Sequence, residues 1–198
     1  MSVFGQLSMS FACGAQDCCA RSCNARVFEI YWSRQITNGF AGKTSVGSEK
    51  KKIGAAIAGG SGYGAGELLR FLCRHPDVEI VSVVSSSNPG SSISSTHPHL
   101  RGFCDFAFAP EVDFSRLACF EQSVVFTSLP HGTSARFIAE MLPRAEKQQT
   151  KVIDLSGDLR LREEALRRKH YPENTAGDEL VRRFVYGMPE LQREQIRA

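Results

Sequence analysis

The sequence predicts an α/β protein built on a doubly wound, mostly parallel sheet. Short apolar or β-branched runs alternate along the chain with amphipathic helical patterns, the order in which parallel strands and crossover helices follow one another. A glycine-rich turn joins the first run to the first helical pattern, and polar residues follow each later run. Because ligands of such sheets bind outside the carboxyl ends of the strands, these segments are the candidate binding residues.

The expected elements begin at residue 53. Strands are expected at residues 53–58, 79–84, 124–129 and 151–155, each rich in apolar or β-branched residues. Helices are expected at residues 67–75 and 134–142, because apolar residues recur at helical spacing and because Pro76 and Pro143 end them. Residues 89–123 show weak periodicity. Residues 185–189 are expected to form a strand that leads into a second, α+β substrate domain.

Composition and charge exclude several classes of protein. The 198 residues include 42% hydrophobic and 23% charged residues, as in ordinary globular domains. A net charge of +3 is too small to indicate a nucleic-acid or membrane partner, and no apolar run reaches the length of about 18 residues that a transmembrane helix needs. Seven cysteines, an odd number, favour reduced thiols over a disulfide framework. We expect Cys73, Cys104 and Cys119 to be small core or surface thiols.

Residues 1–50 differ from the rest by their few acids and their scattered small and polar residues. They are expected to be a disordered extension, translated sequence upstream of the true start, or an organelle transit peptide. The expected location is therefore cytoplasmic, with a plastid or mitochondrion as the alternative. The cysteines of this segment match no zinc-binding spacing, so no metal is expected.

The glycine-rich turn at residues 59–66 is the most informative segment. It lies between a strand and a helix, the context expected of a loop that binds the pyrophosphate of a dinucleotide. Glycine permits positive φ and the close approach of backbone N–H groups, and the helix N-terminus attracts negative charge. The residues expected to bind are Gly59, Gly60, Ser61, Gly62 and Tyr63. A tight turn without a ligand is the alternative, because the glycine spacing departs from G-x-G-x-x-G.

The end of the second strand bears on the choice of cofactor. NAD sites place a carboxylate here to bind the ribose 2′-hydroxyl, but this chain has Ser85-Ser86-Ser87-Asn88. Hydroxyl groups can donate to a 2′-phosphate, and no carboxylate is present to repel it. Ser85 and Ser87 therefore favour NADP over NAD, with a polar serine turn that binds no ligand as the alternative.

Two histidine motifs complete the candidates. In residues 97–102, His-Pro-His-Leu-Arg-Gly, the guanidinium of Arg101 could bind an anionic substrate, although an ordered loop with an arginine salt bridge is equally consistent. In residues 129–132, Leu-Pro-His-Gly, the predicted sheet places His131 on the ligand side. A structural histidine at the start of a helix is the alternative there.

The glycine turn and the two histidine motifs are followed along the chain by two further motifs, VIDLSGDLRL and VYGMPEL. Across residues 53–198 the set resembles the N-acetyl-γ-glutamyl-phosphate reductase family, arginine-pathway relatives of the aspartate-semialdehyde dehydrogenases. The resemblance implies a Rossmann-type domain, which we place at residues 51–170, followed by a connector to a catalytic domain at residues 171–198. It also implies NADPH-dependent reduction of an acyl phosphate, N-acetyl-glutamyl 5-phosphate, to a semialdehyde. A cysteine thiolate would attack the acyl carbon and expel phosphate before hydride transfer.

The same resemblance implies roles for individual residues. Gly59, Ser61, Gly62 and Tyr63 resemble the pyrophosphate loop, Ser85 and Ser87 the 2′-phosphate side, and Leu129, Pro130, His131 and Ser156 the wall near the nicotinamide. Arg101 resembles a substrate-side group. The family often has an arginine where this chain has Ser86, which weakens the preference for NADP.

The family's catalytic cysteine lies in an N-P-G-C-Y motif that these 198 residues do not contain. The nucleophile and its histidine base are therefore expected beyond residue 198. The alternatives are a non-catalytic dinucleotide-binding module and a lysine-pathway or aspartyl-phosphate relative. The complete enzyme is expected to be a homo-oligomer that acts on a small acyl phosphate.

Overall fold

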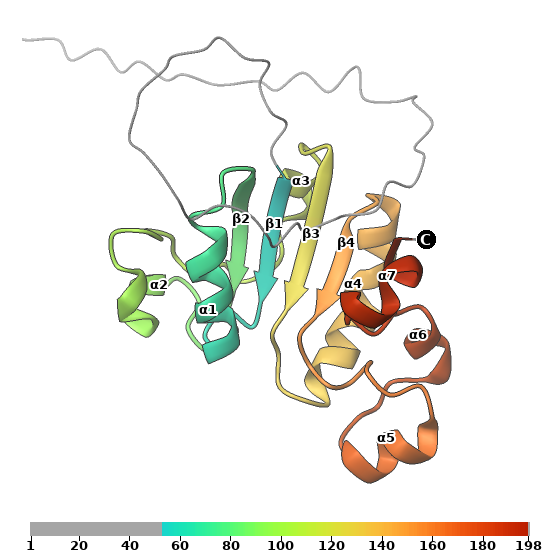
Figure 1. Ribbon diagram of the computed structural model, residues 1–198. Coiled ribbons are helices and arrows are strands. Elements are labelled where there is room, and N and C mark those ends of the chain that lie inside the picture. The colour runs from blue at the N-terminus through green and yellow to red at the C-terminus, as the bar shows by residue number, and fades with distance from the viewer. Residues whose placement is uncertain (1–52, 198) are drawn as a thin grey trace, which may run out of the picture.

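The computed structural model describes residues 53–197 and confirms the predicted sheet (Figure 1). The expectations for residues 1–50, with their cysteines, lie outside the described residues. Four parallel strands are arranged in the order β2-β1-β3-β4. Their bounds are Ile53–Ala58 for β1, Val78–Val84 for β2, Gln122–Thr127 for β3 and Lys151–Asp154 for β4.

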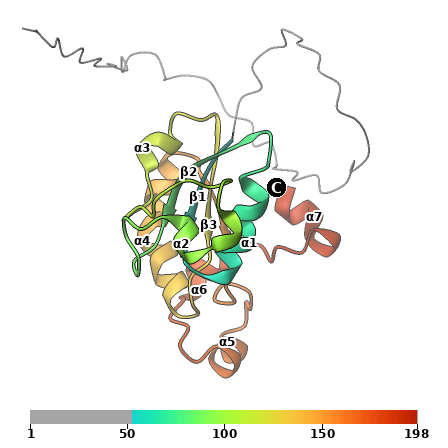
Figure 2. The same cartoon turned by 90° about the vertical axis from the view of Figure 1, so that its left-hand side faces the viewer.

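Helices cover both faces of the sheet, as a doubly wound fold requires (Figure 2). One face carries α1 (Tyr63–Leu72), α2 (Ile93–Thr96) and the 3-10 turn η1 (Pro98–Leu100), and the other carries α3 (Phe114–Leu117) and α4 (Thr133–Lys147). Neighbouring residues of β1 belong to opposite cores, since Ala55 shares a cluster with Leu69 of α1 and Ala56 shares one with Ile138 of α4. The uninterrupted apolar run of β1 follows from this burial on both faces.

Helix α1 begins at Tyr63 and ends at Leu72, so the predicted start at residue 67 is too late and the predicted end at residue 75 is also too late. Glycine disfavours helix interiors, which is why the sequence indicates the later start. In the fold, Ala65 and Leu69 are buried in one core with residues of β1 and β2, and Gly66 is buried against His97. This packing holds the glycine-containing first turn in helical form.

Helix α4 passes through Pro143 and continues to Lys147, so the prediction that Pro143 ends this helix is wrong. A proline inside a helix costs about 3 kcal/mol, because it removes one hydrogen bond and crowds the preceding turn. Met141, Leu142 and Ala145 are buried on either side of the exposed proline. Their packing against the sheet outweighs that cost.

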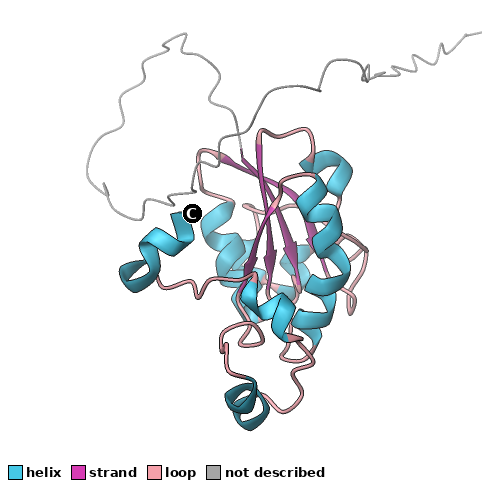
Figure 3. Ribbon diagram, turned by 90° about the vertical axis from the view of Figure 1, so that its right-hand side faces the viewer, coloured by secondary structure: helices cyan, strands magenta, loops and turns pink. Residues whose placement is uncertain are grey.

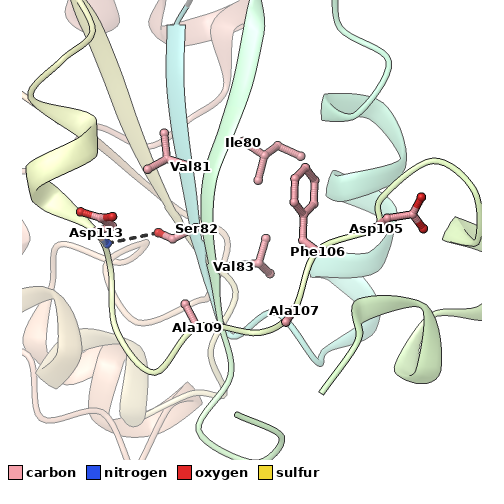
Figure 4. A pocket seen from close by; sticks show the side chains of 9 residues that line it. All are labelled: Ile80, Val81, Ser82, Val83, Asp105, Phe106, Ala107, Ala109 and Asp113. Atoms are coloured by element: carbon pink, nitrogen blue, oxygen red, sulfur yellow. Dashed lines mark hydrogen bonds between the residues drawn. The ribbon is translucent and has the colours of Figure 1, made fainter. Parts of the chain in front are cut away.

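Strand β2 lies at the edge of the sheet, and other parts of the chain protect that edge. The Ala109 N–H donates to Val83 O over 2.8 Å, and Arg116 donates to Val81 O over 3.4 Å. A cavity of about 360 Å³ lies between this edge and residues 105–113 (Figure 4). Among the residues that line it, the Asp113 N–H donates to Ser82 Oγ, 3.2 Å away. None of the predicted binding residues lines this cavity.

Cys73 and Cys104 form a disulfide, so the prediction of reduced thiols is wrong for this pair. Cys73 directly follows α1. Cys104 is fully buried in the segment that follows η1, on the same face of the sheet as α1. Their Cα atoms are 6.4 Å apart, within the range that a disulfide can bridge. They are 31 residues apart in sequence, and only the fold brings them together. Cys119 is free and exposed, as expected of a surface thiol.

The chain after β4 forms short helices: α5 (Glu164–His170), α6 (Asp178–Arg182) and α7 (Pro189–Arg197) (Figure 3). The strand expected at residues 185–189 is not formed. Pro189 instead begins α7, a position in which proline is favoured because its missing N–H has no helical partner anyway. Within residues 53–197, no helix is long and apolar enough to cross a membrane.

Candidate functional site

The carboxyl ends of the four strands meet along one edge of the sheet, the lower edge in Figure 1. Because β2 and β3 lie on opposite sides of β1, the strand order reverses between β1 and β3, and ligand crevices of doubly wound sheets form at this switch point. The predicted binding residues after these strands therefore share one edge: residues 59–63 after β1, 85 and 87 after β2, 129–131 after β3, and 156 after β4.

Gly59 begins the glycine turn in a conformation that other residues rarely adopt. Its φ is +83°, and a Cβ added to it would lie 2.4 Å from Ser128 O and 3.1 Å from the Leu129 side chain. The N–H groups of Gly59 and Gly60 both donate to Val84 O, over 3.1 and 2.7 Å. The turn is thus held between the ends of β2 and β3, where a side chain at Gly59 has no room.

The turn also presents unbonded backbone donors. Gly62 is the N-cap of α1 and has no side chain with which to cap the helix. Among residues 53–197, no acceptor occupies the N–H groups of Ser61, Tyr63 or Gly64, and Tyr63 is 96% exposed. Free N–H groups at the positive end of a ten-residue helix are an arrangement suited to a phosphate.

The serine turn after β2 has a buried and an exposed part. Ser85 is 2% exposed, and its Oγ accepts the Asn88 N–H over 3.3 Å. This hydroxyl stabilises the turn itself, as serine does in ST-turns. Ser86 and Ser87 are exposed. The hydroxyls open to a ligand are therefore those of Ser86 and Ser87, and residues 85–88 hold no carboxylate.

His131 lies between β3 and α4. Its Nδ1 accepts the Gly157 N–H over 3.2 Å and is 3.6 Å from Asp158 Oδ1. A ring nitrogen that accepts a hydrogen bond carries no proton, so the proton of the neutral ring is at Nε2. The ring contacts Tyr171 with the centroids 5.1 Å apart, while the side chain stays 57% exposed. The exposed part of His131 can thus donate from Nε2 to a ligand.

Two carboxylates that the sequence analysis missed hold these segments together. Asp158 is fully buried and accepts the N–H groups of Gly132, over 2.9 Å, and Ala135, over 3.1 Å, so it caps the start of α4. Asp154, at the end of β4, accepts two buried hydroxyls from β3 and α4, each over 2.8 Å. The signal in the sequence is two acids near the end of β4: Asp154 directly follows its apolar residues, and Asp158 lies four residues later.

Two of the predicted site residues, Ser156 and Arg101, do not present a free donor at the strand ends. Ser156 Oγ donates to Asp154 over 2.7 Å and accepts the Asp158 N–H over 3.1 Å, so its hydroxyl is engaged within its own loop. Arg101 is exposed after η1, and in the described part of the chain no hydrogen bond or ion pair joins it to the strand ends. His97 from the same motif is buried instead, and it contacts the glycine turn.

Residues 54–198 match the family model described as semialdehyde dehydrogenase, NAD binding domain. The chain belongs to the semialdehyde dehydrogenase family. The resemblance found in the motifs is thereby confirmed for this family, and the parallel sheet agrees with the fold of its dinucleotide-binding domain.

Relatives of this family member include two proteins named N-acetyl-gamma-glutamyl-phosphate reductase. The one from Nitrosococcus oceani is 43% identical over 145 residues, which are 73% of this chain and 40% of that protein. The one from Cellvibrio japonicus is 39% identical over 146 residues, which are 74% and 40% of the two chains. A LysW-L-2-aminoadipate/LysW-L-glutamate phosphate reductase from Thermococcus kodakarensis is 42% identical over 145 residues, with coverages of 73% and 40%.

The chain spans about 40% of the length of these curated relatives. Among solved structures, aspartate semialdehyde dehydrogenase with NADP from Candida albicans is similar with a TM-score of 0.41 and 18% identity. That comparison covers 55% of this chain and 31% of the other.

The residues of this family member fit the dinucleotide that the family description names. The glycine turn packs so closely on its neighbours that other residues have no room at Gly59 or Gly60, since an added Cβ would lie 2.4 Å from Ser128 O at Gly59 and 2.5 Å from Val83 Cγ1 at Gly60. The donors of Ser61, Tyr63 and Gly64 suit a pyrophosphate. No group of three or more metal-ligating side chains occurs in the part of the chain that the structure describes.

Proposed function

We propose that this chain binds a nicotinamide dinucleotide, NADP(H) in preference to NAD(H), at the carboxyl edge of its sheet. The observation that carries this proposal is the glycine turn, which lies at the switch point between β1 and β3 and whose N–H groups at Ser61, Tyr63 and Gly64 have no acceptor among residues 53–197. A pyrophosphate satisfies these donors and the positive end of α1 together.

The residues around the turn bind and orient the cofactor in distinct ways. Ser86 and Ser87 offer hydroxyl donors to a 2′-phosphate, and Ser85 holds the turn that presents them. Leu129 and Pro130 form the wall beside the nicotinamide, and His131 offers its Nε2 proton. Ser156 acts through its bond to Asp154, which fixes the loop after β4. When bound, the cofactor supplies a hydride.

We infer that the reaction served by this site is reduction of N-acetyl-glutamyl 5-phosphate to the 5-semialdehyde, a step of arginine biosynthesis. Two relatives named N-acetyl-gamma-glutamyl-phosphate reductase, at 43% and 39% identity, support this inference. In this proposal residues 51–170 bind the cofactor, residues 171–198 connect them to the catalytic domain, and Arg101 faces the substrate. A LysW-linked acyl phosphate is the second candidate substrate, because a relative of that name is 42% identical over the same length.

The cofactor proposal is tested by titrating the chain with NADPH and with NADH and following cofactor fluorescence. We expect tighter binding of NADPH. Ser87→Asp should weaken NADPH binding about tenfold or more, because a carboxylate beside the 2′-phosphate repels it, while NADH binding changes little. Ser115→Asp, an exposed serine on α3 on the other face of the sheet, is the matched control. Equal or reversed affinities of the unaltered chain for the two cofactors would refute the NADP preference.

A further inference from the structure

His97 is the histidine of the His-Pro-His-Leu-Arg-Gly motif that the fold buries. Only 4% of it is exposed, whereas His99, two residues later, is exposed. His97 lies between α2 and η1, and its Nε2 is 2.7 Å from Gly60 O, an atom 37 residues earlier in the chain. A carbonyl oxygen can only accept, so Nε2 must carry the proton of this bond.

This bond fixes the central peptide of the glycine turn. The Gly60 N–H donates to Val84 O over 2.7 Å, and the Gly60 carbonyl accepts from His97, so Gly60 is held on both sides. The Gly60 carbonyl and the Ser61 N–H belong to one planar trans peptide, in which the two groups point in opposite directions. Holding the carbonyl toward His97 therefore turns the Ser61 N–H away from the protein interior, to the side where it has no described acceptor.

The position of the His97 ring is itself fixed by α1. A Cβ added to Gly66 would lie 2.7 Å from His97 Nδ1 and 2.9 Å from its Cε1, so the ring packs directly on the first turn of the helix. The Cys73–Cys104 disulfide joins the other end of α1 to the same covering segment. The segment that carries His97 and Cys104 is thus attached to α1 at two places: the His97 ring packs on the first turn of the helix, and Cys104 is bonded to Cys73 just after its last turn.

We propose that His97 is a positioning residue for cofactor binding, which aims the Ser61 N–H at the pyrophosphate by holding the opposite end of the same peptide. The inference rests on the proposed function, because it assigns His97 a part in binding the same cofactor. The bond to the carbonyl also polarises the peptide, which strengthens its N–H as a donor. Neither effect requires His97 to touch the cofactor.

The test compares His97→Gln with His97→Asn. Both replacements are amides, but the glutamine NH₂ reaches the position of Nε2, whereas the asparagine NH₂ reaches only that of Nδ1. Dissociation constants for NADPH are measured by fluorescence titration of the full chain, and circular dichroism checks that each variant is folded. We expect His97→Asn to bind NADPH about ten- to one-hundred-fold more weakly, because the Ser61 N–H then loses its hydrogen bond to the charged pyrophosphate. His97→Gln should stay within about threefold of the unaltered chain. His99→Asn, the matched exposed control, should bind as the unaltered chain does.

Equal affinity of folded His97→Asn and the unaltered chain would overturn the inference, and so would an equal loss in both folded variants, since packing alone would then explain the effect. A second measurement needs neither variant nor cofactor: ¹⁵N NMR of the unaltered chain should show the His97 ring protonated at Nε2. A ring protonated only at Nδ1 cannot make the bond and would overturn the inference by itself. Failure of the proposed function would look different, because the unaltered chain would then bind neither NADPH nor NADH.

Discussion

Replacing Gly59 with alanine tests the geometry of the glycine turn. A residue other than glycine at φ +83° costs about 1–2 kcal/mol, from the contact of its Cβ with its own backbone. The new Cβ would also lie 2.4 Å from Ser128 O and 2.7 Å from Ser128 C, and these backbone atoms at the end of β3 must shift. Overpacking of this kind costs about 1–3 kcal/mol. Together the two effects predict that Gly59→Ala lowers the free energy of unfolding by about 2–5 kcal/mol.

Two matched variants separate the two effects. Gly102 has a φ of +79° and nothing within 4 Å of an added Cβ, so Gly102→Ala should cost only the conformational part, about 1–2 kcal/mol. Gly187 has neither a positive φ nor a close neighbour, and Gly187→Ala should be neutral or stabilise by up to about 1 kcal/mol. Urea denaturation followed by circular dichroism measures all three. A Gly59→Ala variant no less stable than Gly102→Ala would refute the close approach of the turn to β3.

The remaining predictions concern buried charged groups, and the same denaturation assay measures them. Asp158→Ala should lower the free energy of unfolding by about 2–4 kcal/mol, because α4 loses its cap and two backbone N–H groups lose their acceptor, while the exposed Asp105→Ala should stay within about 0.5 kcal/mol. Equal losses in these two variants would contradict the buried cap. Arg167, 4% exposed, donates to the Leu161 and Arg162 carbonyls and pairs with the half-exposed Asp178, so Arg167→Met should lower the free energy of unfolding by about 1–3 kcal/mol, mainly because two carbonyls lose their donor. Its neighbour Arg168 makes an exposed ion pair with Glu164, so Arg168→Met should lower the free energy of unfolding by less than about 1 kcal/mol. Similar losses for the two variants would contradict the buried contacts of Arg167.

The sheet could be predicted from the sequence because its signals are local. Each strand is a short, mostly apolar run, and burial between two helical layers leaves few polar positions within it, such as Ser82 in β2 and Ser123 in β3. The glycine turn was predictable for the same reason, because the strand before it and the helix after it are adjacent in the chain. The strand ends then follow from parallel topology, which places residues after β1, β2, β3 and β4 on one edge.

What the sequence did not reveal depends on contacts between distant residues. His97 and Gly60 are 37 residues apart, Cys73 and Cys104 are 31 apart, and Asp158 caps a helix that begins 25 residues earlier at Thr133. No local pattern marks these pairs. Pro143 illustrates the opposite case, in which a strong local signal is overridden because tertiary packing on both sides keeps the helix intact.

The central claim, that the glycine turn binds the pyrophosphate of a nicotinamide dinucleotide, is tested most directly by NMR. A ¹⁵N-labelled chain is titrated with NADPH while the backbone amide signals are followed. Binding at the proposed site predicts saturable shifts at Ser61, Tyr63 and Gly64, with further shifts at Ser86 and Ser87. Absence of saturable shifts, or shifts confined to the cavity beside β2 at Ser82 and Asp113, would contradict the claim.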